Sequence, residues 1–155
     1  MKFMMIIKSD SKTEAGVMPS EEILIAMGRY NEELIKAGVL LAADGLQPSS
    51  KGARVRHANG RTTVSDGPFA ESKELIAGYW IIQVKSKAEA IEWAKRVPFD
   101  PNGASATSDN AGEIELRQLF EIADFTSDLY PSPEAQKLMK AESEFRKHPQ
   151  GETTQ

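Results

Sequence analysis

The chain has 155 residues, a length that suits one domain with a buried core. Its formal net charge of −4 argues against nucleic acid as a partner, because neutralising phosphate groups requires a clustered positive field. The sequence contains no cysteine, which excludes disulfides, thiolate metal sites and cysteine nucleophiles. With only two histidines, a carboxylate site for Mg²⁺ is the metal chemistry left open, and we expect neither a metal nor a cofactor.

The apolar run over residues 1–7 predicts a buried first strand. The run is too short for a signal-peptide core or a membrane span, so we expect a cytoplasmic protein without membrane contacts. Pro19 and Ser20, followed by two glutamates, predict the start of a helix, and apolar residues continue at helical spacing until Gly38. Residues 39–43 then predict a short strand.

Residues 54–65 predict a β-hairpin. Asn59 and Gly60 are the favoured pair for a two-residue turn, and this turn fixes the register of the two strands. In that register Val55 lies opposite Val64, and His57 lies opposite Thr62.

Residues 75–84 predict the strongest strand of the chain. Trp80 and Ile82 point to one face and Tyr79 and Ile81 to the other, so we expect the strand to be covered on both sides. Ser86 opens a second helix, a long loop follows over residues 98–112, and residues 114–120 alternate as the last strand. A C-terminal helix is predicted from Ser132 to about residue 146.

This order predicts an α+β fold, the ferredoxin-like split β-α-β plan with an inserted β-hairpin and a C-terminal helix. Two helices cover one face of an antiparallel sheet. The other face needs either the C-terminal helix or the sheet of a second subunit, and we expect Trp80 and Ile82 in such an interface. The predicted domain spans residues 1–125. Residues 126–155 form a helical extension that docks through four apolar positions: Ala135, Leu138, Met139 and Phe145.

The tetrapeptide Asp66-Gly67-Pro68-Phe69, followed by Glu71, resembles the signature of the YCII-related family, in its DGPF branch. The resemblance continues through Gly78-Tyr79, Trp93-Ala94 and residues 114–117. It implies a homodimer in which two ferredoxin-like sheets form a dimeric α/β barrel. It also implies an association with extracytoplasmic-function sigma factors, which are candidate partners.

The founding members of this family are proposed to use a histidine and an aspartate as an active pair. Aligned on Gly38, the helix histidine of those members falls near Met27, so the pair is absent from this chain. Asp66 remains a candidate general base, provided that its turn raises its pKa. The competing interpretation is an Asx turn, in which Asp66 accepts hydrogen bonds from neighbouring N–H groups. His57 is a second catalytic candidate, or else a solvated residue near the hairpin tip.

The expected ligand-binding residues cluster around the same signature: Tyr30, Gly67, Pro68, Phe69, Tyr79 and Arg117. Tyr30 also fits the helix core, and Arg117 also fits an ion pair with Glu115 on the same strand face. We therefore expect a small-molecule-binding protein or a cofactor-free enzyme of the lyase or isomerase kind, with a pocket between sheet and helices. The alternative is a non-catalytic regulatory or binding protein linked to an extracytoplasmic-function sigma factor. The sequence leaves open whether any reaction is catalysed.

Overall fold

The computed structural model describes residues 1–69, 74–99, 112–125 and 128–147, with side chains up to residue 145. The expectations that involve Glu71 and most of the loop over residues 98–112 lie outside this part of the chain. The chain divides into two compact units, Met1–Leu119 and Phe120–Gln155. Each unit is described separately below.

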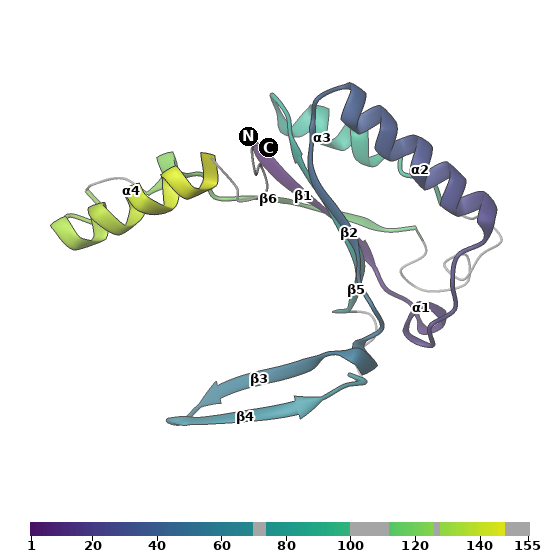
Figure 1. The fold of residues 1–155 in the computed structure, drawn as a ribbon, viewed down its shortest axis with the longest axis horizontal. Helices are drawn as coiled ribbons and strands as arrows, with labels where there is room; N and C mark the ends of the chain where they lie inside the picture. The colour runs from purple at the N-terminus through teal and green to yellow at the C-terminus, as the bar shows by residue number, and fades with distance from the viewer. Residues whose placement is uncertain (70–73, 100–111, 126–127, 148–155) are drawn as a thin grey trace, which may run out of the picture. The chain divides into compact units, whose positions relative to one another are not determined.

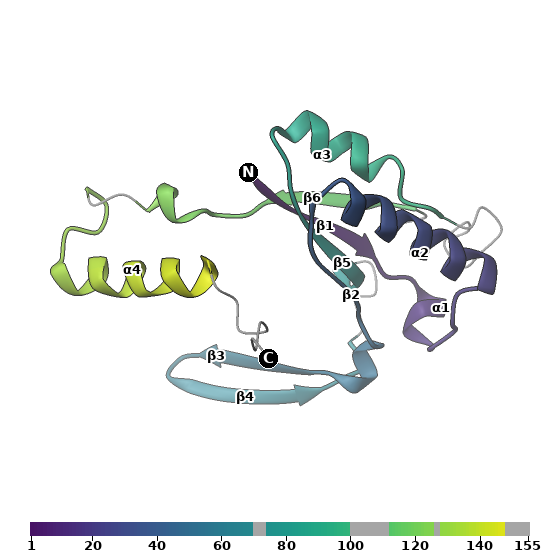
Figure 2. The same ribbon diagram turned by 45° about the horizontal axis from the view of Figure 1, so that its top comes forward.

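The first unit is a mixed α+β structure built on a four-stranded antiparallel sheet in the order β2-β5-β1-β6. α2 connects β1 to β2 and α3 connects β5 to β6, and both helices lie on the same side of the sheet (Figure 1 and Figure 2). In the sheet, β5 lies between the two strands that α2 connects, and β1 lies between the two strands that α3 connects. The bounds are β1 Lys2–Lys8, α2 Glu21–Lys36, β2 Leu40–Gly45, β5 Ile76–Gln83, α3 Lys87–Ala94 and β6 Ile114–Gln118.

Both long helices of this unit begin at the serines that the sequence indicates. The Ser20 hydroxyl accepts a hydrogen bond from Ile23 N–H at 3.4 Å, and the Ser86 hydroxyl accepts one from Glu89 N–H at 3.2 Å. These bonds satisfy backbone donors that a first helical turn leaves unpaired. Gly38 follows α2 with a φ of 68°, a conformation that costs glycine little.

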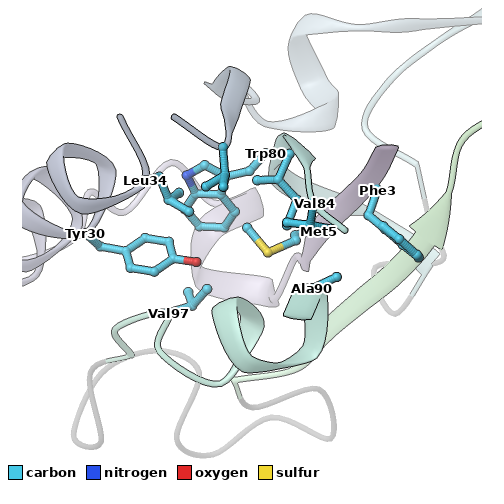
Figure 3. Packing of buried hydrophobic residues seen from close by; sticks show 10 residues of the cluster. Phe3, Met5, Tyr30, Leu34, Trp80, Val84, Ala90 and Val97 are labelled. Carbon is cyan, nitrogen blue, oxygen red and sulfur yellow. The ribbon is translucent and has the colours of Figure 1, made fainter. Parts of the chain in front are cut away.

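The core lies between the sheet and the two helices. Phe3 and Met5 of β1 and Trp80 and Ile82 of β5 point into it, and all four are at most 4% exposed. Trp80 also donates a hydrogen bond through Nε1 to Asn31 Oδ1 of α2 at 2.8 Å. The cluster has six further members: Tyr30, Leu34, Val39, Val84, Ala90 and Val97. Figure 3 shows its labelled members packed together.

The expectation that Trp80 and Ile82 meet a second subunit is therefore wrong, because the helices of the same chain cover them. Tyr79 and Ile81 point to the face of the sheet turned away from α2 and α3, which we call the distal face. The expected pocket between sheet and helices is likewise replaced by packed core side chains.

The inserted hairpin consists of β3 (Ala53–Ala58) and β4 (Arg61–Asp66), and its predicted register is confirmed. Val55 pairs with Val64 and His57 with Thr62. Asn59 and Gly60 form the turn with φ values of 51° and 71°. Every residue of both strands is exposed.

In the described part of the chain, three short helices have no counterpart among the predictions: α1 (Ser11–Glu14), η1 (Ser49–Lys51) and η4 (Ile122–Asp124). η4 belongs to the second unit, whose main element is α4 (Pro133–Lys147). As predicted, Ser132 caps α4, and its hydroxyl accepts a hydrogen bond from Ala135 N–H at 3.1 Å. Of the apolar positions expected to dock this helix, Leu138 and Phe145 are exposed, whereas Ala135 and Met139 are partly buried.

Candidate functional site

The signature turn at residues 66–69 packs against the backbone of η1. Gly67 N–H donates to the Gly52 carbonyl at 3.0 Å, and Phe69 N–H donates to Ser49 Oγ at 3.1 Å. A Cβ atom on Gly67 would overlap the Ser49 carbonyl oxygen and lie 2.6 Å from its carbonyl carbon. Glycine is therefore required at this position by the close approach of two backbones. The Gly67–Pro68 peptide bond is cis.

Ser49 is in turn held by α1. Its N–H donates to Glu14 Oε2 at 3.0 Å, while the Ser9 hydroxyl donates to Glu14 Oε1 at 3.1 Å. Partial burial disfavours the charged form of Glu14, but the hydrogen bonds from Ser49 and Ser9 prevail and lower the pKa of this carboxyl. Asp10 caps the short helix by accepting a hydrogen bond from Thr13 N–H at 2.7 Å.

Asp66 ends β4 with an exposed side chain. The predicted Asx turn is wrong for the Gly67 and Phe69 amides, because Gly52 and Ser49 accept their hydrogen bonds. Within the described residues the Asp66 carboxylate accepts no hydrogen bond and forms no ion pair. A cation–π contact stabilises the turn at Phe69, where the Arg54 guanidinium carbon lies 4.0 Å from the centroid of the ring.

A second group of polar side chains lies on the distal face of the sheet. The Tyr79 hydroxyl donates to Asp44 Oδ2 at 3.2 Å, and this hydrogen bond with the carboxylate raises the pKa of the phenol. Strand pairing places Ile6 beside Tyr79, and Glu115 beyond Ile6. The adjacent row of the same face runs across all four strands: Ala42, Ile81, Met4 and Arg117.

Glu115 is bound by two cations. Lys8 Nζ lies 2.6 Å from Oε2, and Arg117 Nη1 lies 3.1 Å from Oε1. These two partners, Lys8 first, lower the pKa of the Glu115 carboxyl. The predicted Glu115–Arg117 ion pair is thus confirmed. The distal face therefore has apolar side chains in its centre, a phenol–carboxylate pair on one side and an ion-pair cluster on the other.

Tyr30 occupies the core and is only 4% exposed. Its hydroxyl donates to the Trp93 carbonyl at 2.9 Å, and its ring meets the Trp80 ring edge-on at a centroid distance of 5.6 Å (Figure 3). Burial raises the pKa of this phenol to about 12. These contacts correspond to the core interpretation of Tyr30 rather than to a ligand contact.

His57 and Asp66 are not brought together. His57 Nδ1 lies 2.9 Å from Thr62 Oγ1, on the opposite strand of the hairpin. Asp66 lies four residues beyond Thr62 on β4, and this spacing corresponds to about 13 Å along a strand. The two catalytic candidates therefore cannot share a proton directly.

Sequence reasoning missed Glu14, Ser49 and Asp44. Glu14 and Ser49 bond across 35 residues, and Ser49 and Phe69 across 20, so no local pattern connects them. The sequence places Asp44 only at the end of a strand. Asp44 lies directly opposite Tyr79 in the pairing of β2 with β5. An acidic residue next to Gly45 is the sequence signal for this contact, but the pairing of the two strands could not be deduced from the sequence.

The second unit contains a pocket of about 360 Å³, lined by Ile122, Phe125, Tyr130, Gln136, Met139, Lys140 and Ser143. The rings of Phe125 and Tyr130 lie 6.0 Å apart at this pocket. In the described part of the chain, no group of three or more histidine and acidic side chains is arranged to hold a metal ion. No helix in the same part is long and apolar enough to span a membrane.

The family model described as "YCII-related domain" matches residues 1–109. The chain belongs to the YCII-related family. It is also 31% identical over 99 residues to the "Uncharacterized protein R00369" of Rhizobium meliloti (strain 1021), a match that covers 64% of this chain and 74% of the relative.

The YCII-related region contains most of the site described above. It includes α1 with Glu14, the Ser49 segment, the signature turn and the Tyr79–Asp44 pair. β6 with Glu115 and Arg117 lies beyond residue 109, as does the second unit, Phe120–Gln155.

Proposed function

We propose that this YCII-related protein binds a small organic molecule on the distal face of its sheet. The observation that carries the proposal is the arrangement of that face, where Met4, Ile6 and Ile81 form a partly exposed apolar floor. Small-molecule sites combine such a floor with a few polar groups that fix the orientation of the ligand. Here those groups are the Tyr79–Asp44 pair and the Lys8–Glu115–Arg117 cluster.

The two polar groups differ in what they offer to a ligand. The Arg117 side chain is 70% exposed, so its remaining N–H donors can bind a carboxylate or a similar anion. The Asp44 carboxylate accepts the Tyr79 hydroxyl, and this pair can accept or donate a proton beside the apolar floor. Such chemistry suits a cofactor-free lyase or isomerase, and simple binding needs only the contacts. Asp66 and His57 remain predicted catalytic residues, each exposed on the hairpin.

We further propose that the ferredoxin-like subunits form a homodimer through their distal faces, as a dimeric α/β barrel that encloses the ligand. The strand order β2-β5-β1-β6 and the apolar side chains on the distal face support this arrangement. Ile81→Glu should give a folded monomer, because the new charge is placed on the distal face, whereas Ile82→Glu should unfold the chain. A wild-type protein that sediments as a monomer at equilibrium contradicts the dimer.

Thermal-shift measurements test the binding site. We expect benzoate, 4-hydroxybenzoate, pyruvate or succinate to raise the melting temperature of the wild type, because a ligand that binds only the native state stabilises it. Arg117→Gln should abolish the shift and Tyr79→Phe should reduce it. The matched control is Arg29→Gln on the exposed surface of α2, which should leave the shift unchanged. Equal shifts in all three variants, or no shift with any of these probes, refute the site.

A further inference from the structure

Three segments that are distant in the sequence meet at Ser49. Glu14 belongs to α1 and binds the Ser49 N–H, and Phe69 belongs to the signature turn and binds the Ser49 hydroxyl. A third bond, from Gly52 N–H to the Ser49 carbonyl at 3.0 Å, closes η1 at the base of the hairpin. Ser49 thus uses its N–H, its carbonyl and its side chain for three different parts of the unit.

The Ser49 hydroxyl has a role that few side chains can fill. The Phe69 amide lies in a partly buried environment and needs an acceptor, because an unpaired donor away from water is destabilising. Threonine keeps an oxygen at the same position, whereas alanine removes it. The Gly67 amide offers an internal comparison, since it bonds to Gly52 and not to the Ser49 side chain.

Glu14 has an equally specific place. Its two carboxylate oxygens bind different segments, Oε1 the hydroxyl of Ser9 and Oε2 the amide of Ser49. Ser9 is only 2% exposed, so one end of this bridge is fixed in the interior. α1 has four residues, too few to be stable as an isolated helix, and it is held in place by such contacts.

We propose that Glu14 and Ser49 act together as positioning residues that fix the signature turn and leave the Asp66 carboxylate directed to solvent. Because Gly52 and Ser49 accept the turn's amide hydrogen bonds, Asp66 is not required to stabilise the turn. Its exposed carboxylate is then available to bind a cationic or hydrogen-bond-donating group. This inference is independent of ligand binding on the distal face, since it concerns the turn itself.

Amide hydrogen exchange of the full-length protein, followed by NMR, tests the proposal. Ser49→Ala should accelerate exchange at Phe69 by roughly tenfold or more, because the amide loses its acceptor, and Ser49→Thr should restore slow exchange. Glu14→Gln should accelerate exchange at both Ser49 and Phe69, although Glu14 touches only the first of these residues. The matched control is Glu22→Gln, an exposed acid in the first turn of α2, which should change neither.

The double variant separates joint action from two independent effects. If Glu14 acts through Ser49, Glu14→Gln should add little at Phe69 once Ser49 is alanine. The amide of Met5, which is fully buried, reports global unfolding, so an acceleration at Phe69 that exceeds the acceleration at Met5 identifies a local effect on the turn. Glu14→Gln that accelerates exchange at Ser49 but leaves Phe69 unchanged overturns the proposal. Ser49→Thr that behaves like Ser49→Ala overturns it as well.

Discussion

Replacing Gly67 by alanine tests the packing of the signature turn against η1. The added methyl group would overlap the Ser49 carbonyl oxygen and lie 2.6 Å from the Ser49 carbonyl carbon and 3.1 Å from Ser50 Cα. These are backbone atoms, so no side-chain rotation relieves the overlap and the turn must move away. The movement breaks the hydrogen bonds from Gly67 to Gly52 and from Phe69 to Ser49.

Each lost hydrogen bond contributes about 0.5–1.5 kcal/mol, so Gly67→Ala should lower the free energy of unfolding by about 1–3 kcal/mol. Urea denaturation followed by tryptophan fluorescence measures this value, with amide exchange at Phe69 as a local readout. Gly28→Ala is the matched control. Gly28 lies within α2, and a Cβ atom added there would meet no atom within 4 Å beyond its chain neighbours and the backbone of its own helix, so this change should stabilise the protein by about 0.5–1 kcal/mol. The reasoning is refuted if Gly67→Ala leaves both the unfolding free energy and the Phe69 exchange rate at wild-type values.

Three further predictions concern single side chains. Tyr30→Phe removes the hydroxyl that donates a partly buried hydrogen bond to the Trp93 carbonyl, and the change should cost about 1–2 kcal/mol in denaturant unfolding; a wild-type value would contradict this role. The pKa of Glu14 is lowered from its usual value of 4.5 by folding, so its contribution to stability is complete above that pH and is lost as the pH falls through the folded-state pKa. Glu14→Gln should therefore flatten this part of the pH dependence of unfolding, and an unchanged profile would exclude the linkage. Asp66→Ala and Asp66→Asn should both keep the unfolding free energy within about 0.5 kcal/mol of the wild type, as expected for exposed positions, and a larger loss in Asp66→Ala alone would restore a structural role for its carboxylate.

Local sequence signals predict the elements that depend on neighbouring residues. Asn59 and Gly60 determine the hairpin register, because a two-residue turn aligns both strands. Ser20 and Ser86 mark the starts of α2 and α3, because capping involves residues three positions apart. The alternation of the last strand also places Glu115 and Arg117 on one face, where they form an ion pair.

The remaining features depend on contacts between distant segments. β5 carries large apolar side chains on both faces, so its sequence does not tell which face the helices cover, and the prediction for Trp80 and Ile82 chose the wrong one. The Asx turn predicted for Asp66 is wrong for a similar reason. The Asp66 carboxylate is the acceptor nearest in the sequence to the amides of the turn, but these amides donate to Gly52 and Ser49 instead. Phe69 donates to Ser49, which lies 20 residues earlier.

The exposed hairpin also makes the chain a practical scaffold. No residue of β3 or β4 is buried, and among the described residues the two strands pair only with each other. A peptide inserted between Asn59 and Gly60 would lengthen a surface loop, and the entropic cost of such an extension grows slowly with its length. The tip of the hairpin is therefore a suitable place for an epitope or a spectroscopic label, attached without cutting into the sheet that carries Tyr79 and Arg117.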